Sequence, residues 1–218
     1  MYKFIKRFLD IVFAFLAIVL LSPLMLIIAI AVKIESRGPV IFKQERLGKD
    51  TEIFMLYKFR SMVVGAEQQS TKQYSFAGDP RVTRVGKIIR ATSLDELPQL
   101  FNIIKGDMSF IGPRPPLTYH PWELSEYTEK QLRMFEVRPG MSGWAQVNGR
   151  KEVEWHERIN LNIYYIDHCS IMLDIKILFM TVIKVFKRED NQNHGVTVIP
   201  NSEYYKTEED DEKESVNA

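Results

Sequence analysis

The sequence predicts a largely helical α+β protein, with one small domain attached to an N-terminal membrane segment. Three observations support this fold class. The run from Phe8 to Val32 is almost free of charge. The residues between this run and position 191 are numerous enough to build one core of their own. Within them, short alternating patterns typical of strands precede segments with helical periodicity.

The apolar run predicts a re-entrant helix hairpin, which enters and leaves the membrane on one side. About 25 helical residues reach roughly 37 Å, enough to cross a hydrocarbon core of about 30 Å. Basic residues flank both ends of the run: Lys3, Lys6, Arg7, Lys33 and Arg37. Both ends therefore look cytoplasmic. Pro23 should bend the helix, and the Ser22 hydroxyl can bond backbone groups freed there. A kinked helix that crosses once is the alternative.

Charge and composition divide the chain into three parts. We expect a membrane anchor over residues 1–36, a cytoplasmic domain over 37–190 and a polar, acidic tail over 191–218. Residues 201–218 carry seven acids and two lysines, a net charge of −5, which leaves +6 for residues 1–200 of a formal total of +1. The basic body suits anionic lipids and anionic substrates, whereas the tail has the composition of disorder. The single cysteine, Cys169, excludes a disulfide framework.

Two short strands, which together can form a hairpin, are expected over residues 38–44 and 52–60. Both segments alternate β-branched or aromatic residues with polar ones after turn residues. Lys58 and Arg60 stand at alternate positions of the second strand and therefore share one face. We predict that this face contacts phosphate.

The densest polar chemistry lies between residues 79 and 116, and we interpret it as an active site. Asp95 and Glu96 lie between arginines at positions 81, 84, 90 and 114. Carboxylates, arginines and a metal ion are expected where an enzyme binds a doubly charged phosphate. Ser93 and Glu96 have the spacing of a capping box, which would place both acids in the first turn of a helix. If Pro98 instead occupies the first helical position, the acids fall just before the helix.

Either position lies near the positive end of a helix, which favours an ionised Asp95. An ionised aspartate can attack phosphorus, and Glu96 beside it can ligate Mg²⁺. Most such pairs at helix starts only cap the helix, but the surrounding arginines favour catalysis here.

Two further segments carry candidate binding residues. Residues 112–116, Gly-Pro-Arg-Pro-Pro, hold Arg114 on a stiff backbone, either as a phosphate clamp or as a solvated side chain on a rigid turn. Residues 138–150 join a glycine-rich loop to an aromatic residue, two amides and two arginines. Arg138, Gln146 and Arg150 in this loop suit contacts with a nucleobase or a sugar.

Six motifs, in this order, give the chain a resemblance to a known family. They are K-R-x-x-D at residue 6, L-S-P at 21, Y-K-F-R-S-M at 57, S-L-D-E-L-P-Q at 93, G-P-R-P at 112 and R-P-G-M-S-G-W-A-Q-V-N-G-R at 138. The chain resembles the bacterial monotopic phosphoglycosyl transferases, also called the bacterial sugar transferase family, over most of residues 1–190. It resembles their minimal form, which consists of anchor and catalytic domain.

The resemblance implies transfer of a phospho-sugar from a UDP-sugar to polyprenyl phosphate, with release of UMP, at the cytoplasmic face of the bacterial inner membrane. It implies Asp95 as nucleophile, Glu96 as its partner and Mg²⁺ bridging the diphosphate. Arg114 matches the family's clamp, with Arg90 and Lys58 as phosphate neighbours. The break at Ser22-Pro23 matches that of the family's re-entrant helix.

If the resemblance holds, residues 173–188 form an amphipathic helix that lies in the membrane interface with its lysines outward. The alternative is that they form a core helix of the soluble domain. The expected partners are a UDP-sugar, polyprenyl phosphate and an anionic phospholipid membrane, and no nucleic acid. The residues identify neither the sugar nor an oligomeric state.

Two other functions fit parts of the sequence. A Mg²⁺-dependent hydrolase of membrane diphosphates would use the same acids with water as acceptor. A non-enzymatic, membrane-anchored scaffold would bind partners through its basic surface and acidic tail and would not need Asp95. The chain has no P-loop, dinucleotide fingerprint or zinc-type histidine spacing, so nucleotide hydrolysis, hydride transfer and zinc chemistry lack a motif.

Overall fold

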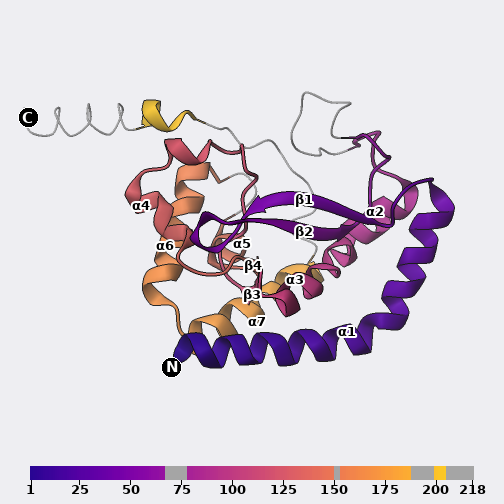
Figure 1. The fold of residues 1–218 in the computed structure, drawn as a ribbon, viewed down its shortest axis with the longest axis horizontal. Helices are drawn as coiled ribbons and strands as arrows, with labels where there is room; N and C mark the ends of the chain where they lie inside the picture. Colours follow the sequence, from indigo (N-terminus) through magenta and orange to yellow (C-terminus); the bar gives the residue numbers. More distant parts are fainter. Residues whose placement is uncertain (67–77, 150–152, 188–198, 205–218) are drawn as a thin grey trace, which may run out of the picture.

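The computed structural model describes residues 1–66, 78–149, 153–187 and 199–204 (Figure 1). It shows a mostly helical α+β fold, as the sequence predicts, and contains two small sheets. A long helix, α1 (Tyr2–Glu35), runs along the base of the molecule and turns upward along one side (Figure 1). The remaining elements pack inside this bend.

Helix α1 contains Pro23 in its interior and continues through it as one helix. Proline has no backbone N–H, so the Val19 carbonyl loses the bond that a residue at position 23 would otherwise donate. The Ser22 hydroxyl donates to this carbonyl over 2.9 Å. A bent, apolar helix is therefore the part of the predicted anchor that the structure shows.

Many large apolar side chains of α1 are exposed. Phe4, Leu20 and Ile34 are each about four-fifths exposed. Within the described part of the chain, α1 is the helix long and apolar enough to cross a membrane. Exposed apolar surface of this length indicates association with lipid.

The predicted hairpin is present. Strands β1 (Ile41–Leu47) and β2 (Ile53–Phe59) pair antiparallel, with Ile41 opposite Phe59. The short turn η1 (Lys49–Thr51) joins them. A second, parallel pair consists of β3 (Ser109–Ile111) and β4 (Gly140–Ser142).

Helices surround these sheets, and their bounds are α2 (Arg84–Ala91), α3 (Gln99–Lys105), α4 (Glu129–Leu132), α5 (Trp144–Asn148), α6 (Trp155–His168) and α7 (Ile171–Lys187). The further short turns are η2 (Leu94–Glu96), η3 (Leu124–Glu126) and η4 (Arg133–Phe135). The first half of α1 packs on α3 through Ala14 and Ile103. Its second half packs on β2 and α2 through Val32 and Ile89. Both arms of the bent helix therefore support the domain.

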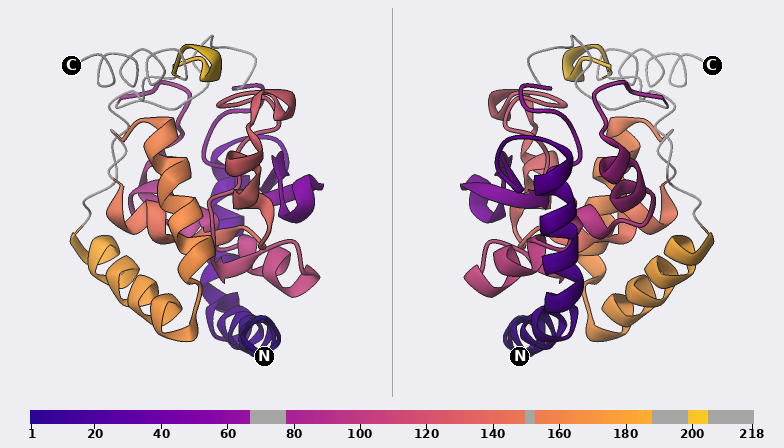
Figure 2. Two further views of the ribbon diagram at one scale, coloured as in Figure 1. Left: turned by 90° about the vertical axis from the view of Figure 1, so that its left-hand side faces the viewer. Right: turned by 90° about the vertical axis from the view of Figure 1, so that its right-hand side faces the viewer.

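Helix α7 has one packed face and one exposed apolar face. Ile177 is fully buried against Ile111 and Tyr165. The exposed apolar residues are Ile171, Met172, Ile175, Leu178, Phe179, Val182, Ile183 and Val185. Of the lysines expected to point outward, Lys176 is exposed and lies over the Trp144 ring, and Lys184 donates to the Gln146 carbonyl. In Figure 2, α7 lies along one side of the molecule, near α1.

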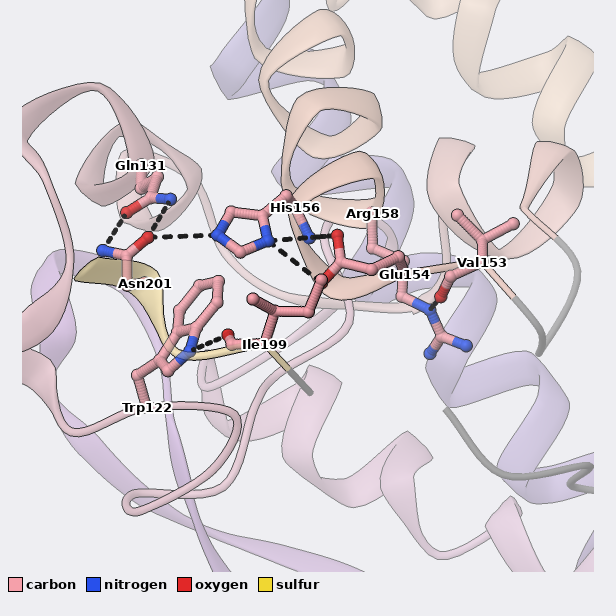
Figure 3. Close-up of polar contacts among 8 residues, drawn as sticks. All are labelled: Trp122, Gln131, Val153, Glu154, His156, Arg158, Ile199 and Asn201. Atoms are coloured by element: carbon pink, nitrogen blue, oxygen red, sulfur yellow. Dashed lines mark hydrogen bonds and ion pairs between the residues drawn. The ribbon is translucent and has the colours of Figure 1, made fainter. Parts of the chain in front are cut away.

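Residues 199–204 were assigned to the acidic tail from composition, but they pack on the domain (Figure 3). Asn201 is buried, exchanges hydrogen bonds with Gln131 and lies 3.2 Å from Nε2 of His156. The indole N–H of Trp122 donates to the Ile199 carbonyl over 3.1 Å. The rest of the predicted tail lies outside the described residues.

Candidate active site

The two acids lie in the turn η2, immediately before α3. Ser93 does not cap this turn with its side chain, and its backbone has a left-handed conformation with φ of 57°. Helix α3 starts at Gln99, after Pro98. The capping-box prediction is therefore wrong, and the second register, with the acids just before the helix, is the one observed. A left-handed non-glycine residue costs about 1–3 kcal/mol, and such strain clusters at functional sites.

Apolar packing holds this turn in place. Leu94 and Leu97 contact the cluster formed by Ile28 and Val32 of α1 and Phe59 of β2. The carboxylates thus stand on a turn whose underside rests on the second arm of the membrane helix. A displacement of that arm would move the acids directly.

Glu96 lies at the centre of an ion-pair network. Its Oε1 atom is 2.7 Å from Nζ of Lys58 and 3.1 Å from Nη2 of Arg114. Burial acts to raise the pKa of Glu96, but the charges of Lys58 and Arg114 outweigh it and hold the pKa well below its usual range. Glu96 is therefore ionised at neutral pH.

Asp95 differs from its neighbour. It is half-buried, and within the described residues its carboxylate makes no hydrogen bond or ion pair. Burial raises the pKa of Asp95, the Glu96 charge raises it further, and the charges of Lys58, Arg90 and Arg114 oppose the rise. The sequence-based reason for an ionised Asp95 was a helix end; in the structure, the three cations supply the stabilising charge.

The loop that carries Arg114 is fixed from two sides. Arg46 of β1 donates from Nη1 to the Pro115 carbonyl over 3.1 Å, and the backbone N–H of Leu47 donates to Pro116 over 3.1 Å. On the other side the loop touches the backbone of residues 138–143. A Cβ on Gly112 would lie 2.4 Å from the Arg138 carbonyl oxygen, so this close approach requires glycine.

Five of the candidate residues therefore converge: Asp95, Glu96, Lys58, Arg90 and Arg114. Arg60 does not join them. It is buried, and its guanidinium donates to the carbonyls of Val32, Ser36 and Arg37 at the end of α1. Strand alternation placed Lys58 and Arg60 on one face, but Arg60 follows the last residue of β2 and serves α1 instead.

The three candidate residues of the glycine-rich loop do not lie together at the acids. Arg138 donates from Nε to the Gly106 carbonyl over 2.7 Å, at the far end of α3 from the acids. Both side-chain amide atoms of Gln146 are buried without a hydrogen-bond partner among the described residues. A Cβ on Gly143 would come within 2.7 Å of that amide. Arg150 lies outside the described residues.

The donor set near Asp95 fits magnesium held jointly with a phosphate ligand. Mg²⁺ is usually bound through one or two carboxylates, several waters and substrate phosphates. Asp95 and Oε2 of Glu96 supply such oxygens. No group of three histidine, cysteine or acidic side chains that could hold a metal occurs within the described ranges. These donors therefore suit a metal ion that is held partly by the diphosphate of the substrate, and not one that is held by protein ligands alone.

Comparison with known proteins decides the family. The family model described as Bacterial sugar transferase matches residues 1–188. The chain belongs to the bacterial sugar transferase family. It is 48% identical over 184 residues, 83% of its length, to the UDP-N-acetylgalactosamine-undecaprenyl-phosphate N-acetylgalactosaminephosphotransferase of Aeromonas hydrophila. It is 44% identical over 189 residues, 84% of its length, to the UDP-glucose:undecaprenyl-phosphate glucose-1-phosphate transferase of Escherichia coli K12.

Family members differ in length. The chain spans 43% of the Aeromonas protein and 40% of the Escherichia coli protein. It spans 92% of the uncharacterized sugar transferase EpsL of Bacillus subtilis strain 168, with 42% identity over 192 residues and 87% of this chain covered. The similarity to this sugar transferase thus extends over nearly the whole of both chains.

Two residues that hold the site together were missed from the sequence. Arg46 fixes the Arg114 loop, and the fully buried Asn102 fixes α3 on the hairpin. Asn102 accepts from the Tyr57 N–H over 3.0 Å and donates to the Met55 carbonyl over 2.7 Å. Asn102 occupies a position in α3 where the pattern predicts an apolar residue, and a polar residue there was the available signal.

Proposed function

We propose that this sugar transferase moves a phospho-sugar from a UDP-sugar to polyprenyl phosphate, such as undecaprenyl phosphate, and releases UMP. The observation that carries the proposal is the unpaired Asp95 carboxylate beside the network of Lys58, Glu96 and Arg114. The names of the Aeromonas and Escherichia coli relatives support the donor and acceptor classes. This reaction would start the assembly of a bacterial surface polysaccharide or glycoconjugate.

The reaction has two balanced steps. The Asp95 carboxylate attacks the sugar-linked phosphorus, the bond from this phosphorus to the bridging oxygen breaks, and UMP leaves with that oxygen. The resulting aspartyl phospho-sugar is then attacked by an oxygen of polyprenyl phosphate. The acyl phosphate bond breaks, Asp95 returns as carboxylate, and polyprenyl-diphosphate-sugar forms.

The surrounding residues hold the negative charge of the donor. Arg114 stands on a rigid loop with its guanidinium half exposed, which suits a clamp on the diphosphate. Lys58 and Arg90 supply further positive charge around Asp95. Mg²⁺, held by Asp95 and Glu96 together with the diphosphate, would neutralise charge on the leaving phosphate when bound.

The anchor brings the acceptor lipid to this site. We propose that α1 enters the inner membrane from the cytoplasmic face, bends at Ser22-Pro23 and returns to the same face. The basic flanks of the apolar run and the packing of both arms on one domain support this arrangement. The exposed apolar face of α7 would lie in the interface of an anionic leaflet. The turn with Asp95 rests on the second arm, so the reactive carboxylate would lie close to the lipid surface.

The test is release of UMP from a panel of UDP-sugars, with polyprenyl phosphate and Mg²⁺, by the wild type and Asp95→Asn. We expect release that requires lipid, metal and Asp95, and the productive donor names the sugar. Product analysis separates a transferase from a hydrolase, because the hydrolase yields free sugar phosphate. Equal release by the wild type and Asp95→Asn would refute the mechanism.

A further inference from the structure

A second basic site lies at the opposite end of α3 from the acids, where the start of α1 meets the junction of α6 and α7 (Figure 1). A cavity of about 60 Å³ opens there. Its lining includes Lys3, Lys6, Arg7, Lys49, Ser109 and Arg138. A water needs about 10–15 Å³ by this measure, so the cavity has room for a group of roughly four or five non-hydrogen atoms, the size of a phosphate.

Positive charge remains available in this cavity after the internal pairs are counted. Lys6 is paired with Asp174 at 2.9 Å, and Lys49 with Asp50. Lys3 has no ion pair or hydrogen bond within the described ranges. Arg138 uses only its Nε, and no partner for its two terminal nitrogens is seen among the described residues.

The acids that line the cavity are already satisfied. The Asp10 carboxylate accepts the Phe110 N–H over 3.2 Å, and burial raises its pKa. Glu136 pairs with Arg133 at 3.2 Å. The cavity therefore keeps a net positive charge.

Two arginines, Arg7 and Arg138, line the cavity side by side at the end of α3. Arg7 donates to the carbonyls of Ile103 and Ile104 over 2.7 and 3.1 Å, and Arg138 donates to that of Gly106. Both guanidiniums are thus held at the end of α3 and cannot move apart freely. The buried Ser109 hydroxyl also lines the cavity and lies beside Asp10. The two fixed guanidiniums form the donor set of an anion site.

Apolar side chains that suit a membrane flank this cavity. Phe4 and Phe8 are exposed on the same turns of α1 as Lys3 and Arg7. The exposed residues of α7 begin at Ile171, close to Tyr165 and Cys169, which line the cavity. Basic pockets at the membrane surface attract anionic headgroups, and inserted aromatic residues bring such headgroups within reach.

We propose that this cavity binds the phosphate of an anionic phospholipid headgroup, at a site separate from Asp95 and Glu96. The proposal rests on the membrane association proposed above and not on the transfer chemistry. Bound lipid would tie the start of α1 to α3 and α6 and so set the depth of the helix in the leaflet. It also gives Arg138 a ligand that the Asp95 site does not provide.

The test is native mass spectrometry of the detergent-purified protein incubated with equal amounts of phosphatidylglycerol and phosphatidylcholine. Phosphatidylcholine carries the same phosphate with a cationic head, which the basic cavity should repel. We expect retained adducts of phosphatidylglycerol, and Lys3→Glu should reduce them about five- to tenfold, the scale of one partly exposed ionic contact. Lys87→Glu, an exposed charge reversal on α2, is the matched control and should keep them.

A second arm measures melting temperature in inorganic phosphate against chloride of equal ionic strength. Stabilisation by inorganic phosphate, lost in Lys3→Glu, without preference for phosphatidylglycerol would show a free-anion site and overturn the lipid assignment. Equal binding of both lipids, or equal loss in Lys87→Glu, would also overturn it. UMP release measured on the same samples keeps the two proposals apart, since a failed lipid test with normal release refutes only this one.

Discussion

Replacing Lys58 by glutamine tests whether the positive charge beside Glu96 and Asp95 is needed for the reaction. Lys58→Gln keeps a hydrogen-bond donor for Oε1 of Glu96 but removes one of the two positive charges that hold it. Both members of the Lys58–Glu96 pair are about one-fifth exposed, so solvent screens their attraction only in part. A hydrogen bond between two charged groups contributes about 1.5–3 kcal/mol and one from a neutral donor about 0.5–1.5 kcal/mol, so the substitution should cost about 1–1.5 kcal/mol, roughly 5- to 13-fold in kcat/KM.

The same substitution should change the pH dependence. Asp95 acts as a carboxylate, so the rate falls as the pH falls through its pKa. The Lys58 charge lowers the pKa of Asp95, and its removal should therefore raise that pKa. We expect the acidic limb of the kcat/KM profile for UMP release to move to higher pH.

The control for Lys58→Gln lies on the same hairpin. Lys43 of β1 is exposed and lies over the Tyr57 ring, and Lys43→Gln should leave rate and profile unchanged. A loss of rate in Lys58→Gln without movement of the acidic limb would refute the effect of Lys58 on the pKa of Asp95, because Lys58 would then act on the substrate alone.

Three further substitutions test other parts of the structure. Arg60→Met should lower the free energy of unfolding by about 2–4 kcal/mol, because the last carbonyls of α1 lose a charged donor; chemical denaturation measures this. Asn201→Ala should cost about 1–3 kcal/mol, because buried Gln131 and His156 lose a partner; thermal melting measures it. Pro23→Leu should straighten α1 and carry a share of the N-termini across the membrane. An impermeant reagent measures that share on a cysteine placed before Met1 in a Cys169→Ser background.

Each of these three predictions has an outcome that would contradict it, and Arg60→Met also has a matched control. Arg84→Met removes an exposed arginine of α2, and an equal loss of stability there would show that Arg60 has no special role. A melting temperature unchanged by Asn201→Ala would show that residues 199–204 are not held as the structure shows. For Pro23, labelling of the wild-type N-terminus only from the side opposite the domain would show a single crossing.

Local patterns predicted the elements that depend on neighbouring residues. Alternation located the β1–β2 hairpin, and the apolar run with Pro23 located α1 and its bend. The cluster of Asp95, Glu96, Lys58 and Arg114 was also predicted, since strong motifs mark these positions. Their meeting at Oε1 of Glu96 is a tertiary contact that no local pattern contains.

The sequence predictions for Arg60, Ser93 and Asn201 were wrong for a common physical reason. Arg60 was predicted to share a strand face with Lys58, but it follows the last residue of β2 and its partners come from the end of α1, which strand periodicity does not locate. The spacing of Ser93 and Glu96 matched a capping box, yet the left-handed backbone at Ser93 prevents the cap. Composition assigned Asn201 to a solvated tail, whereas Gln131 and His156 bury it. Each of these results depends on residues distant in sequence or on backbone conformation.

The central claim is that Asp95 becomes covalently bonded to the phospho-sugar. The direct measurement is intact mass spectrometry of the purified protein mixed with its UDP-sugar and Mg²⁺ in the absence of polyprenyl phosphate. We expect a mass increase equal to one sugar phosphate, accompanied by about one UMP per protein, and neither in Asp95→Asn. Absence of both until the lipid acceptor is added would contradict the covalent mechanism and show direct transfer between the two substrates.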